Sequence, residues 1–225
     1  MHYASRMIRV MVSGAAGRMG QAVVAAVNGA PDMTLVARAD PQATGELAFG
    51  DVVSAIDATT PDVAVDFTQP QVAFPNVEAC LSRGVHVVLG TTGLGDDDFD
   101  ALRRLSDAGP ANCVFAPNFA VGAVLMMRFA AIASRHMPKA EIIELHHDQK
   151  LDAPSGTAFR TAALMEGDVP IHSVRLPGLV AHQEVLLAGE GQLLTIRHDA
   201  FSREAYVPGV LLVLGWVLIR RGKID

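Results

Sequence analysis

The chain has 225 residues, of which 50% are hydrophobic and 19% charged, with a formal net charge of −6 and a pI of about 5.7. This length and apolar content allow a substantial core in one large domain or two small ones. The acidic balance gives no electrostatic footprint for nucleic acid or for an anionic membrane surface, so we predict neither as a partner.

The cysteine content and the lengths of the apolar runs exclude further classes. Cys80 and Cys113 are far apart, have no metal-ligand spacing and stand beside apolar residues, so we interpret both as reduced core thiols. No apolar run reaches the roughly 20 residues that span a bilayer, and the N-terminus shows no signal-peptide pattern. The apolar run that comes nearest to this length, 210–219, is predicted to be a buried helix or strand. We therefore expect a cytoplasmic protein.

The first half of the chain alternates strands with helices. Short apolar runs rich in β-branched residues predict strands, and helical periodicity predicts the segments between them. The expected strands are 8–12, 34–37, 63–67, 85–89 and 114–115, and the expected helices are 19–28, 73–81 and 96–107. This alternation indicates the α/β class, with a doubly wound parallel sheet.

The pattern changes after Asn118. An apolar helix over 121–133 leads to a strand over 141–146, and the later strands 171–176, 183–188 and 193–198 follow with few helices between them. This order is typical of an α+β domain with a mixed or open sheet. We expect one domain made of 1–118 plus 206–225, and a second made of 119–205.

A glycine-rich loop follows the first predicted strand and opens the first predicted helix. It reads Gly14-Ala15-Ala16-Gly17-Arg18-Met19-Gly20, with the spacing G-x-x-G-x-x-G. In this context glycines allow a tight turn and a close approach of the backbone to a pyrophosphate, whose charge the helix N-terminus stabilises. The loop therefore predicts a dinucleotide site, although a purely structural glycine turn would leave the same pattern.

Acidic and basic residues in the glycine-rich loop and near the second strand bear on the choice of cofactor. Asp40 lies about twenty residues after the loop, where a carboxylate can accept hydrogen bonds from the ribose hydroxyls of NADH. Arg38 and Arg18 are guanidinium groups that could instead accommodate the 2′-phosphate of NADPH. The sequence leaves this preference open.

Two further loops follow predicted strand ends and are candidates for the nicotinamide side of the site. They are Gly90-Thr91-Thr92-Gly93 and Ala116-Pro117-Asn118-Phe119. Open α/β sheets bind ligands outside the carboxyl ends of their strands, so both loops are placed to contact a cofactor. Each alone would be an ordinary turn, and their recurrence favours a functional role.

A dense group of reactive side chains lies between Glu144 and Thr157. It includes His146, His147, Lys150 and Asp152. Adjacent histidines in a strand face opposite ways, and the span lacks the i, i+4 histidine pair of a helical zinc site, so we predict no metal. A hydride acceptor needs a proton at the atom that gains charge, and His146 or Lys150 could supply it. Lys150 could also hold a substrate carboxylate.

The loop after Lys150 contains Ser155, Gly156 and Thr157. Ser155 lacks the G-x-S-x-G context of a nucleophile. We interpret the three residues as an anion cradle at a helix start, with a plain helix cap as the alternative.

These motifs together resemble the 4-hydroxy-tetrahydrodipicolinate reductase (dihydrodipicolinate reductase) family of bacterial diaminopimelate and lysine synthesis. The likeness covers most of the chain and rests on Gly14 to Gly20, Val65-Asp66-Phe67-Thr68, Gly90 to Gly93, Ala116 to Phe119, and above all Glu144 to Ala158. The last stretch is similar to the family signature E-x-H-H-x-x-K-x-D-A-P-S-G-T-A.

The resemblance implies a Rossmann-like dinucleotide-binding domain joined to an α+β domain that binds the substrate and builds a homotetramer. NADH or NADPH would reduce a cyclic dicarboxylate imine, with His146 as proton donor and Lys150 as second donor or carboxylate ligand. The remaining expected ligands fall into two sets. Substrate binders are His147, Ser155, Gly156 and Thr157, and cofactor contacts are Gly14, Ala15, Ala16, Gly17, Arg18, Met19, Asp40, Gly90, Thr91, Thr92, Ala116, Pro117, Asn118 and Phe119.

Two departures from the family pattern bear, in turn, on the tetramer interface or the closing of the domains, and on the packing of the N-terminal domain. The stretch from Ala163 to Val169 is shorter than usual, and the tail ends at Asp225 without the usual finish.

Two other functions would explain part of the sequence. One is another Rossmann oxidoreductase, such as one acting on a semialdehyde, which should place a cysteine or a different acid–base pair at the nicotinamide. The other is a non-enzymatic NAD(P) sensor, which gives no reason for the His-His-Lys cluster.

Overall fold

The computed structural model describes residues 6–116 and 118–218, and the chain divides into two compact units. One unit comprises Met1–Pro117 and Gly209–Asp225, and the other Asn118–Pro208. Asn118 and residues 206–208, which were predicted to lie in the first domain, thus group with the second unit. For Asn118 the reason is local, because its side chain bonds to Ala120 and Thr157 of that unit.

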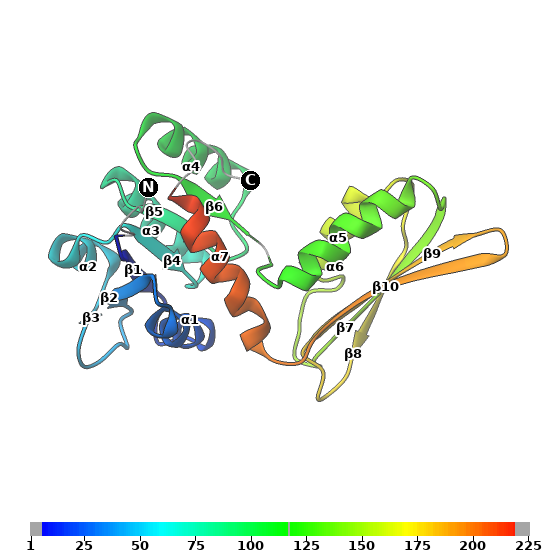
Figure 1. Ribbon diagram of the computed structural model, residues 1–225, viewed down its shortest axis with the longest axis horizontal. Helices are drawn as coiled ribbons and strands as arrows, with labels where there is room; N and C mark the ends of the chain where they lie inside the picture. Colours follow the sequence, from blue (N-terminus) through cyan, green and yellow to red (C-terminus); the bar gives the residue numbers. More distant parts are fainter. Residues whose placement is uncertain (1–5, 117, 219–225) are drawn as a thin grey trace. The chain divides into compact units, whose positions relative to one another are not determined.

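The first unit is built on a six-stranded parallel sheet (Figure 1). Its strands are β1 (Ile8–Ser13), β2 (Met33–Ala39), β3 (Ala48–Phe49), β4 (Val63–Asp66), β5 (His86–Leu89) and β6 (Cys113–Phe115). The order β3-β2-β1-β4-β5-β6 places the first strand in the centre, with the chain winding outward on both sides. This is the strand order of the Rossmann fold, whose topological switch lies between β1 and β4.

The helices of this unit bury apolar side chains on the sheet. They are α1 (Arg18–Gly29), α2 (Val52–Thr59), α3 (Pro70–Ser82), α4 (Asp96–Ala108) and, from Gly209 onward, most of α7 (Val207–Val217). One core gathers residues of α2, α3 and α4 around Met11, Ala64 and Val87. Val10 alternates with Met11 along β1, so it points to the opposite face, and α1 packs against β1 and β2. Both Cys80 and Cys113 are buried free thiols of the first core, as expected.

Two elements of the first unit, β3 and α2, were not predicted from the sequence. Strand β3 has two residues, too few to show a period. Helix α2 has eight residues, and its start carries a cap signal, because Asp51 accepts a hydrogen bond from the Ser54 N–H at 2.8 Å. The segment predicted as helix or strand near 210 is a helix, α7, whose Val210, Leu214 and Val217 are fully buried.

The second unit is a four-stranded mixed sheet with helices on one face (Figure 1). The sheet order is β10-β9-β7-β8, formed by β7 (Lys139–His146), β8 (Ile171–Arg175), β9 (Ala181–Gly189) and β10 (Gln192–Ala200). Strands β7 and β8 are parallel and the other pairs antiparallel. Helices α5 (Val121–Ser134) and α6 (Gly156–Leu164) share a core with Ile142, Val185 and Leu187. A short 3₁₀ turn, η1 (Arg203–Tyr206), precedes α7.

None of the helices in the described ranges is long and apolar enough to cross a membrane.

Candidate active site

The glycine-rich loop joins β1 to α1 at the centre of the first sheet. Gly14 has φ +77°, and a Cβ there would lie 2.4 Å from the Phe67 carbonyl oxygen. A Cβ on Gly20 would lie 2.0 Å from the Gly14 carbonyl oxygen, so both positions require glycine. Gly17 is the N-cap of α1, and no side chain caps that helix start. The first turn of α1 is therefore open to an anion, as a pyrophosphate site requires.

Asp40 follows β2 directly, beside this loop. Its carboxylate accepts hydrogen bonds from the Ala16 N–H at 3.1 Å and the Gln42 N–H at 2.8 Å. The Arg38 guanidinium donates instead to the carbonyl oxygens of Thr44, at 2.7 Å, and Glu46, at 2.5 Å. Arg18 is exposed at the first residue of α1. Asp40 thus contacts the glycine-rich loop, whereas the Arg38 guanidinium is bound to its own neighbouring turn.

The loop after β5 is tied to the end of β4 by a buried carboxylate. Asp66 is 2% exposed and accepts hydrogen bonds from the hydroxyls of Thr91 and Thr68, both at 2.7 Å. The Phe67 ring packs against Gly90, where a Cβ would lie 2.2 Å from it. The Thr91 hydroxyl is therefore committed to the fold, whereas Thr92 is exposed. The motif Val65-Asp66-Phe67-Thr68 does not by itself indicate that Asp66 holds the loop after β5.

The loop after β6 divides between the two units. The Ala116 N–H donates to the Leu89 carbonyl at 3.1 Å. Pro117 lies outside the described residues. The Asn118 side chain accepts from the Ala120 N–H at 2.9 Å and donates to the Thr157 hydroxyl at 3.0 Å. Phe119 is buried. Asn118 and Phe119 were predicted as cofactor contacts, and both belong to the unit that carries the histidine cluster.

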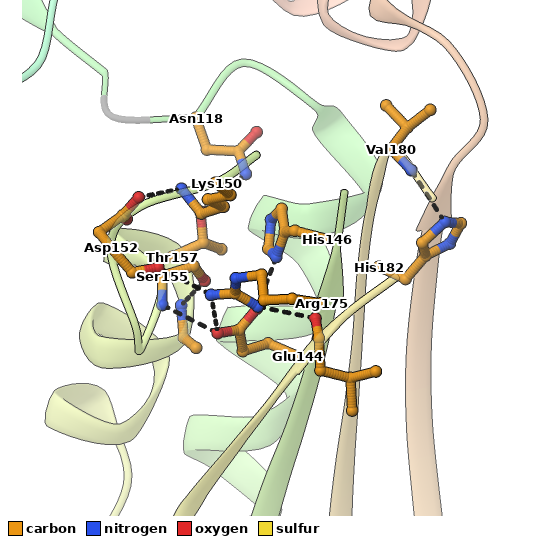
Figure 2. Close-up of polar contacts among 12 residues, drawn as sticks. Asn118, Glu144, His146, Lys150, Asp152, Ser155, Thr157, Arg175, Val180 and His182 are labelled. Atoms are coloured by element: carbon orange, nitrogen blue, oxygen red, sulfur yellow. Dashed lines mark hydrogen bonds and ion pairs between the residues drawn. The ribbon is translucent and has the colours of Figure 1, made fainter. Parts of the chain in front are cut away.

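The second unit brings together His146, Glu144 and Arg175 at the end of β7 (Figure 2). Arg175 lies directly across from His146 in the β7–β8 register. Its guanidinium forms a fork on the carboxylate of Glu144, with Nη2 to Oε1 at 2.7 Å and Nη1 to Oε2 at 2.9 Å. His146 Nδ1 lies 2.5 Å from Glu144 Oε2. Arg175 is not among the residues predicted from the sequence, because its place at the site depends on strand pairing.

The charge of Glu144 determines which nitrogen of His146 carries the proton. Burial acts to raise the pKa of Glu144, but hydrogen bonds from Arg175, Ser173 and His146 outweigh it and lower that pKa to about 2. An ionised carboxylate can only accept, so His146 donates through Nδ1. Burial also lowers the pKa of His146 against the opposing effect of Glu144, so a neutral imidazole with an unprotonated Nε2 is favoured.

Lys150 lies in the loop that follows β7 and forms an ion pair with Asp152. Lys150 Nζ lies 2.7 Å from Asp152 Oδ1. Burial acts to raise the pKa of Asp152, but the contacts with Lys150 outweigh it, so that pKa is lowered. The side chain of Lys150 is 22% exposed, and that of Asp152 is 58% exposed. Lys150 can therefore reach a ligand without leaving a buried partner unsatisfied.

The loop from Ser155 to Thr157 starts helix α6. Ser155 is its N-cap and accepts from the Ala158 N–H at 3.2 Å, so the hydroxyl has the capping role expected as the alternative to an anion cradle. The Ser155 N–H donates to Glu144 Oε1 at 3.2 Å. Gly156 is the first residue of the helix, and a Cβ there would meet nothing within 4 Å. His147 follows β7 and is partly buried.

Over residues 6–116 and 118–218, no group of three or more His, Cys, Asp or Glu is arranged to hold a metal ion.

Two family models match this sequence. "Dihydrodipicolinate reductase, N-terminus" matches residues 8–119, and "Dihydrodipicolinate reductase, C-terminus" matches residues 122–224. The chain belongs to the dihydrodipicolinate reductase family. The fold and the family predicted from the sequence are thereby confirmed.

Individual members of the family match over nearly their whole length. The 4-hydroxy-tetrahydrodipicolinate reductase of Syntrophomonas wolfei is 41% identical, over 95% of this chain and 94% of its own. That of Desulfitobacterium hafniense is 45% identical over 92% of each chain. The dipicolinate-bound dihydrodipicolinate reductase of Paenisporosarcina sp. TG-14 is 38% identical, with a TM-score of 0.88 and 97% coverage of both chains. A myo-inositol 2-dehydrogenase of Lactobacillus plantarum, 13% identical with a TM-score of 0.70, shares the fold.

The alignment with the Syntrophomonas relative also bears on the predicted shortening. It runs over 251 residues, more than the 225 of this chain, so the relative has residues with no counterpart here. In the chain described here, α6 ends at Leu164 and β8 begins at Ile171. The position of the shortening, between Ala163 and Val169, stays a prediction.

Proposed function

We propose that this protein reduces 4-hydroxy-tetrahydrodipicolinate to tetrahydrodipicolinate in diaminopimelate and lysine synthesis. One substrate, one NAD(P)H and one proton give the product, NAD(P)⁺ and one water. The observation that carries the proposal is the cluster of His146, Lys150 and the α6 N-terminus in a member of this reductase family. This cluster offers an acid and a cationic anion site, the two functions that reduction of a dicarboxylate imine requires.

The residues of the first unit fit a nicotinamide dinucleotide. The cradle formed by Gly14 and Gly20 has no room for a Cβ, and the uncapped start of α1 can receive the pyrophosphate. Further cofactor contacts are proposed from the loops that hold Gly90, Thr91, Thr92 and Ala116. When bound, the cofactor supplies the hydride.

We propose that NADH serves at least as well as NADPH. The carboxylate of Asp40 contacts the Ala16 N–H, where ribose hydroxyls could donate to it. The Arg38 guanidinium is held by two backbone carbonyls, so it would have to leave them to bind a 2′-phosphate.

The residues of the second unit would bind the substrate and manage its proton. Lys150 and the N–H groups at the start of α6, near Gly156 and Thr157, are suited to the two carboxylates. His147 is proposed as a further substrate contact. His146 is the proposed proton donor at the atom that gains charge, with Lys150 as the alternative. Because Nδ1 of His146 donates to Glu144, the proton would pass through Nε2.

We also propose that the protein is a cytoplasmic homotetramer built through the sheet of the second unit. Helices α5 and α6 cover one face of this sheet, and the other face carries the partly buried side chains of Ile143, Leu145 and Leu186. Leu193 of the edge strand β10 is 64% exposed. Apolar side chains on a bare sheet face are typical of a surface that a partner covers.

Coupled turnover tests the function. Dihydrodipicolinate synthase generates the substrate in place, and absorbance at 340 nm follows NADH or NADPH. We expect oxidation only in the presence of the synthase product, with kcat/KM for NADH equal to or above that for NADPH. An absence of turnover with both cofactors would refute the function, whereas a strong preference for NADPH would refute only the role given to Asp40.

A further inference from the structure

Glu144 contacts His146 on the Nδ1 side, and Arg175 contacts Glu144. Neither residue is among those expected to contact the substrate. We infer that they form a positioning pair, which holds the His146 ring through Nδ1 and leaves Nε2 to take up a proton when a dicarboxylate binds. The inference rests on the proposed function, because it concerns the proton consumed in that reduction. It is supported by the geometry of the pair and by the balance of charge around the imidazole.

The carboxylate of Glu144 is fully buried and connects three parts of the unit. It contacts His146 on β7, the guanidinium of Arg175 on β8 and the Ser155 N–H at the start of α6. Arg175 extends the connection, because its Nη2 also donates to the Asp152 carbonyl at 2.7 Å. One ion pair, whose carboxylate is buried, thus contacts His146 and both ends of the loop that carries Lys150.

Charges of both signs act on His146. Glu144 contributes a negative charge, and Lys150 and Arg175 each contribute a positive one. Asp152 forms an ion pair with Lys150. The cross-strand neighbour on β9 is Ala181, which has no charge. A carboxylate alone beside an imidazole would favour the imidazolium. Here burial has the largest effect and Arg175 opposes Glu144, so the pKa of His146 lies below its ordinary value.

A dicarboxylate ligand would change this balance. Its carboxylates add negative charge at the open side of the cluster, which favours a proton on Nε2. The proton taken up on binding is then the one transferred to the substrate when the hydride arrives, so each turnover consumes one proton. The Nδ1 bond to Glu144 keeps the ring in place through both states.

The first test uses the unmodified protein. With ¹⁵N-labelled histidine, long-range ¹H–¹⁵N spectra at pH 7.5 should show His146 protonated at Nδ1 and bare at Nε2, the signal being assigned by its loss in His146→Gln. Calorimetric titration with dipicolinate in buffers of different ionisation enthalpy should show a net proton uptake approaching one per site. A charged imidazole, an Nε2–H tautomer or zero proton uptake would overturn the inference.

The second test separates positioning from a merely structural role. In Arg175→Met the uncompensated carboxylate should move the His146 titration midpoint up, and in Glu144→Gln the uncompensated guanidinium should move it down. Arg175→Lys keeps the charge, so its midpoint should stay near that of the unmodified protein. Both neutralising variants should lose about 10- to 100-fold in kcat/KM, by analogy with the hydrogen-bond partners that orient metal-ligating side chains.

Matched controls come from the exposed ion pair Asp100 and Arg103 of α4, at 2.7 Å. Asp100→Asn and Arg103→Met should leave the His146 midpoint unchanged. Shifts of the same sign in Arg175→Met and Glu144→Gln, or no shift in either, would refute the pair's role. If a variant fails to fold, the tautomer and the proton uptake of the unmodified protein still test the inference. If the expected tautomer and proton uptake are observed but the protein shows no turnover, the proposed function is refuted, whereas the positioning role of Glu144 and Arg175 is not.

Discussion

Lys150 and His146 differ in how the fold holds them, and this difference separates their proposed roles. His146 is fixed by a buried carboxylate, whereas Lys150 forms an ion pair with a side chain that is 58% exposed. An exposed ion pair contributes little to stability, so a ligand carboxylate can replace Asp152 as the partner of Lys150 at small cost. Of the two residues, Lys150 is therefore the one that can be removed with less effect on the fold.

We predict that Lys150→Ala lowers kcat/KM at least 100-fold, because it removes a charge-assisted contact and a candidate acid. The Kd for NADH should change less than threefold, since the glycine-rich loop lies in the other unit. Steady-state kinetics and fluorescence titration with NADH measure the two quantities. Arg160→Ala, which removes an exposed cation from α6, is the control. Equal losses in turnover and NADH affinity would contradict a role on the substrate side.

At the level of elements, the turn between β1 and α1 shows how a binding loop can depend on backbone packing. The glycines at 14 and 20 are required by contacts within the chain, independent of any ligand. The same close packing brings the start of α1 against the end of β1, which is the geometry of a pyrophosphate site. The structural and functional explanations of the motif are thus compatible.

Two alanine substitutions in α1 test this dependence. Gly20→Ala should destabilise the protein by about 1–3 kcal/mol through overpacking, and should weaken NADH binding at least tenfold. Gly29→Ala, at the other end of α1, meets nothing within 4 Å and should be neutral or stabilising by about 0.5–1 kcal/mol. Thermal unfolding and NADH titration measure both effects. Normal NADH affinity in folded Gly20→Ala would contradict the assignment of the loop.

At the level of the whole molecule, the second sheet leaves one face without helices. Side chains alternate along β10, and Ile196 packs into the core beneath the helices, so Leu193 points to the bare face. A partner that covers this face would remove exposed apolar surface and protect the edge of β10.

We expect light scattering to give about four times the 23.8 kDa mass of one chain. Leu193→Glu should shift the protein toward smaller species, because it would place a charge in an apolar interface. Leu212→Glu, at a 66% exposed position of α7, is the matched control. A monomeric wild-type protein, or an unchanged mass in Leu193→Glu, would contradict assembly through this face.

Features that depend on neighbours along the chain could be predicted from the amino-acid sequence. The glycine-rich turn, the alternation of strands and helices up to β6, and the grouping of His146, Lys150 and Ser155 are all local patterns. Short elements such as β3 and α2 escaped prediction, because two or eight residues carry too little periodicity.

The pairing of distant segments became visible only in the folded chain. The strand order around β1 and the register of β7 with β8 are set by contacts between residues far apart in the sequence. Arg175 follows Glu144 by 31 residues, and no local pattern connects them. The strand pairing places the guanidinium of Arg175 on the buried carboxylate of Glu144 beside His146, so only folding brings Arg175 to a site whose other residues are visible in the sequence.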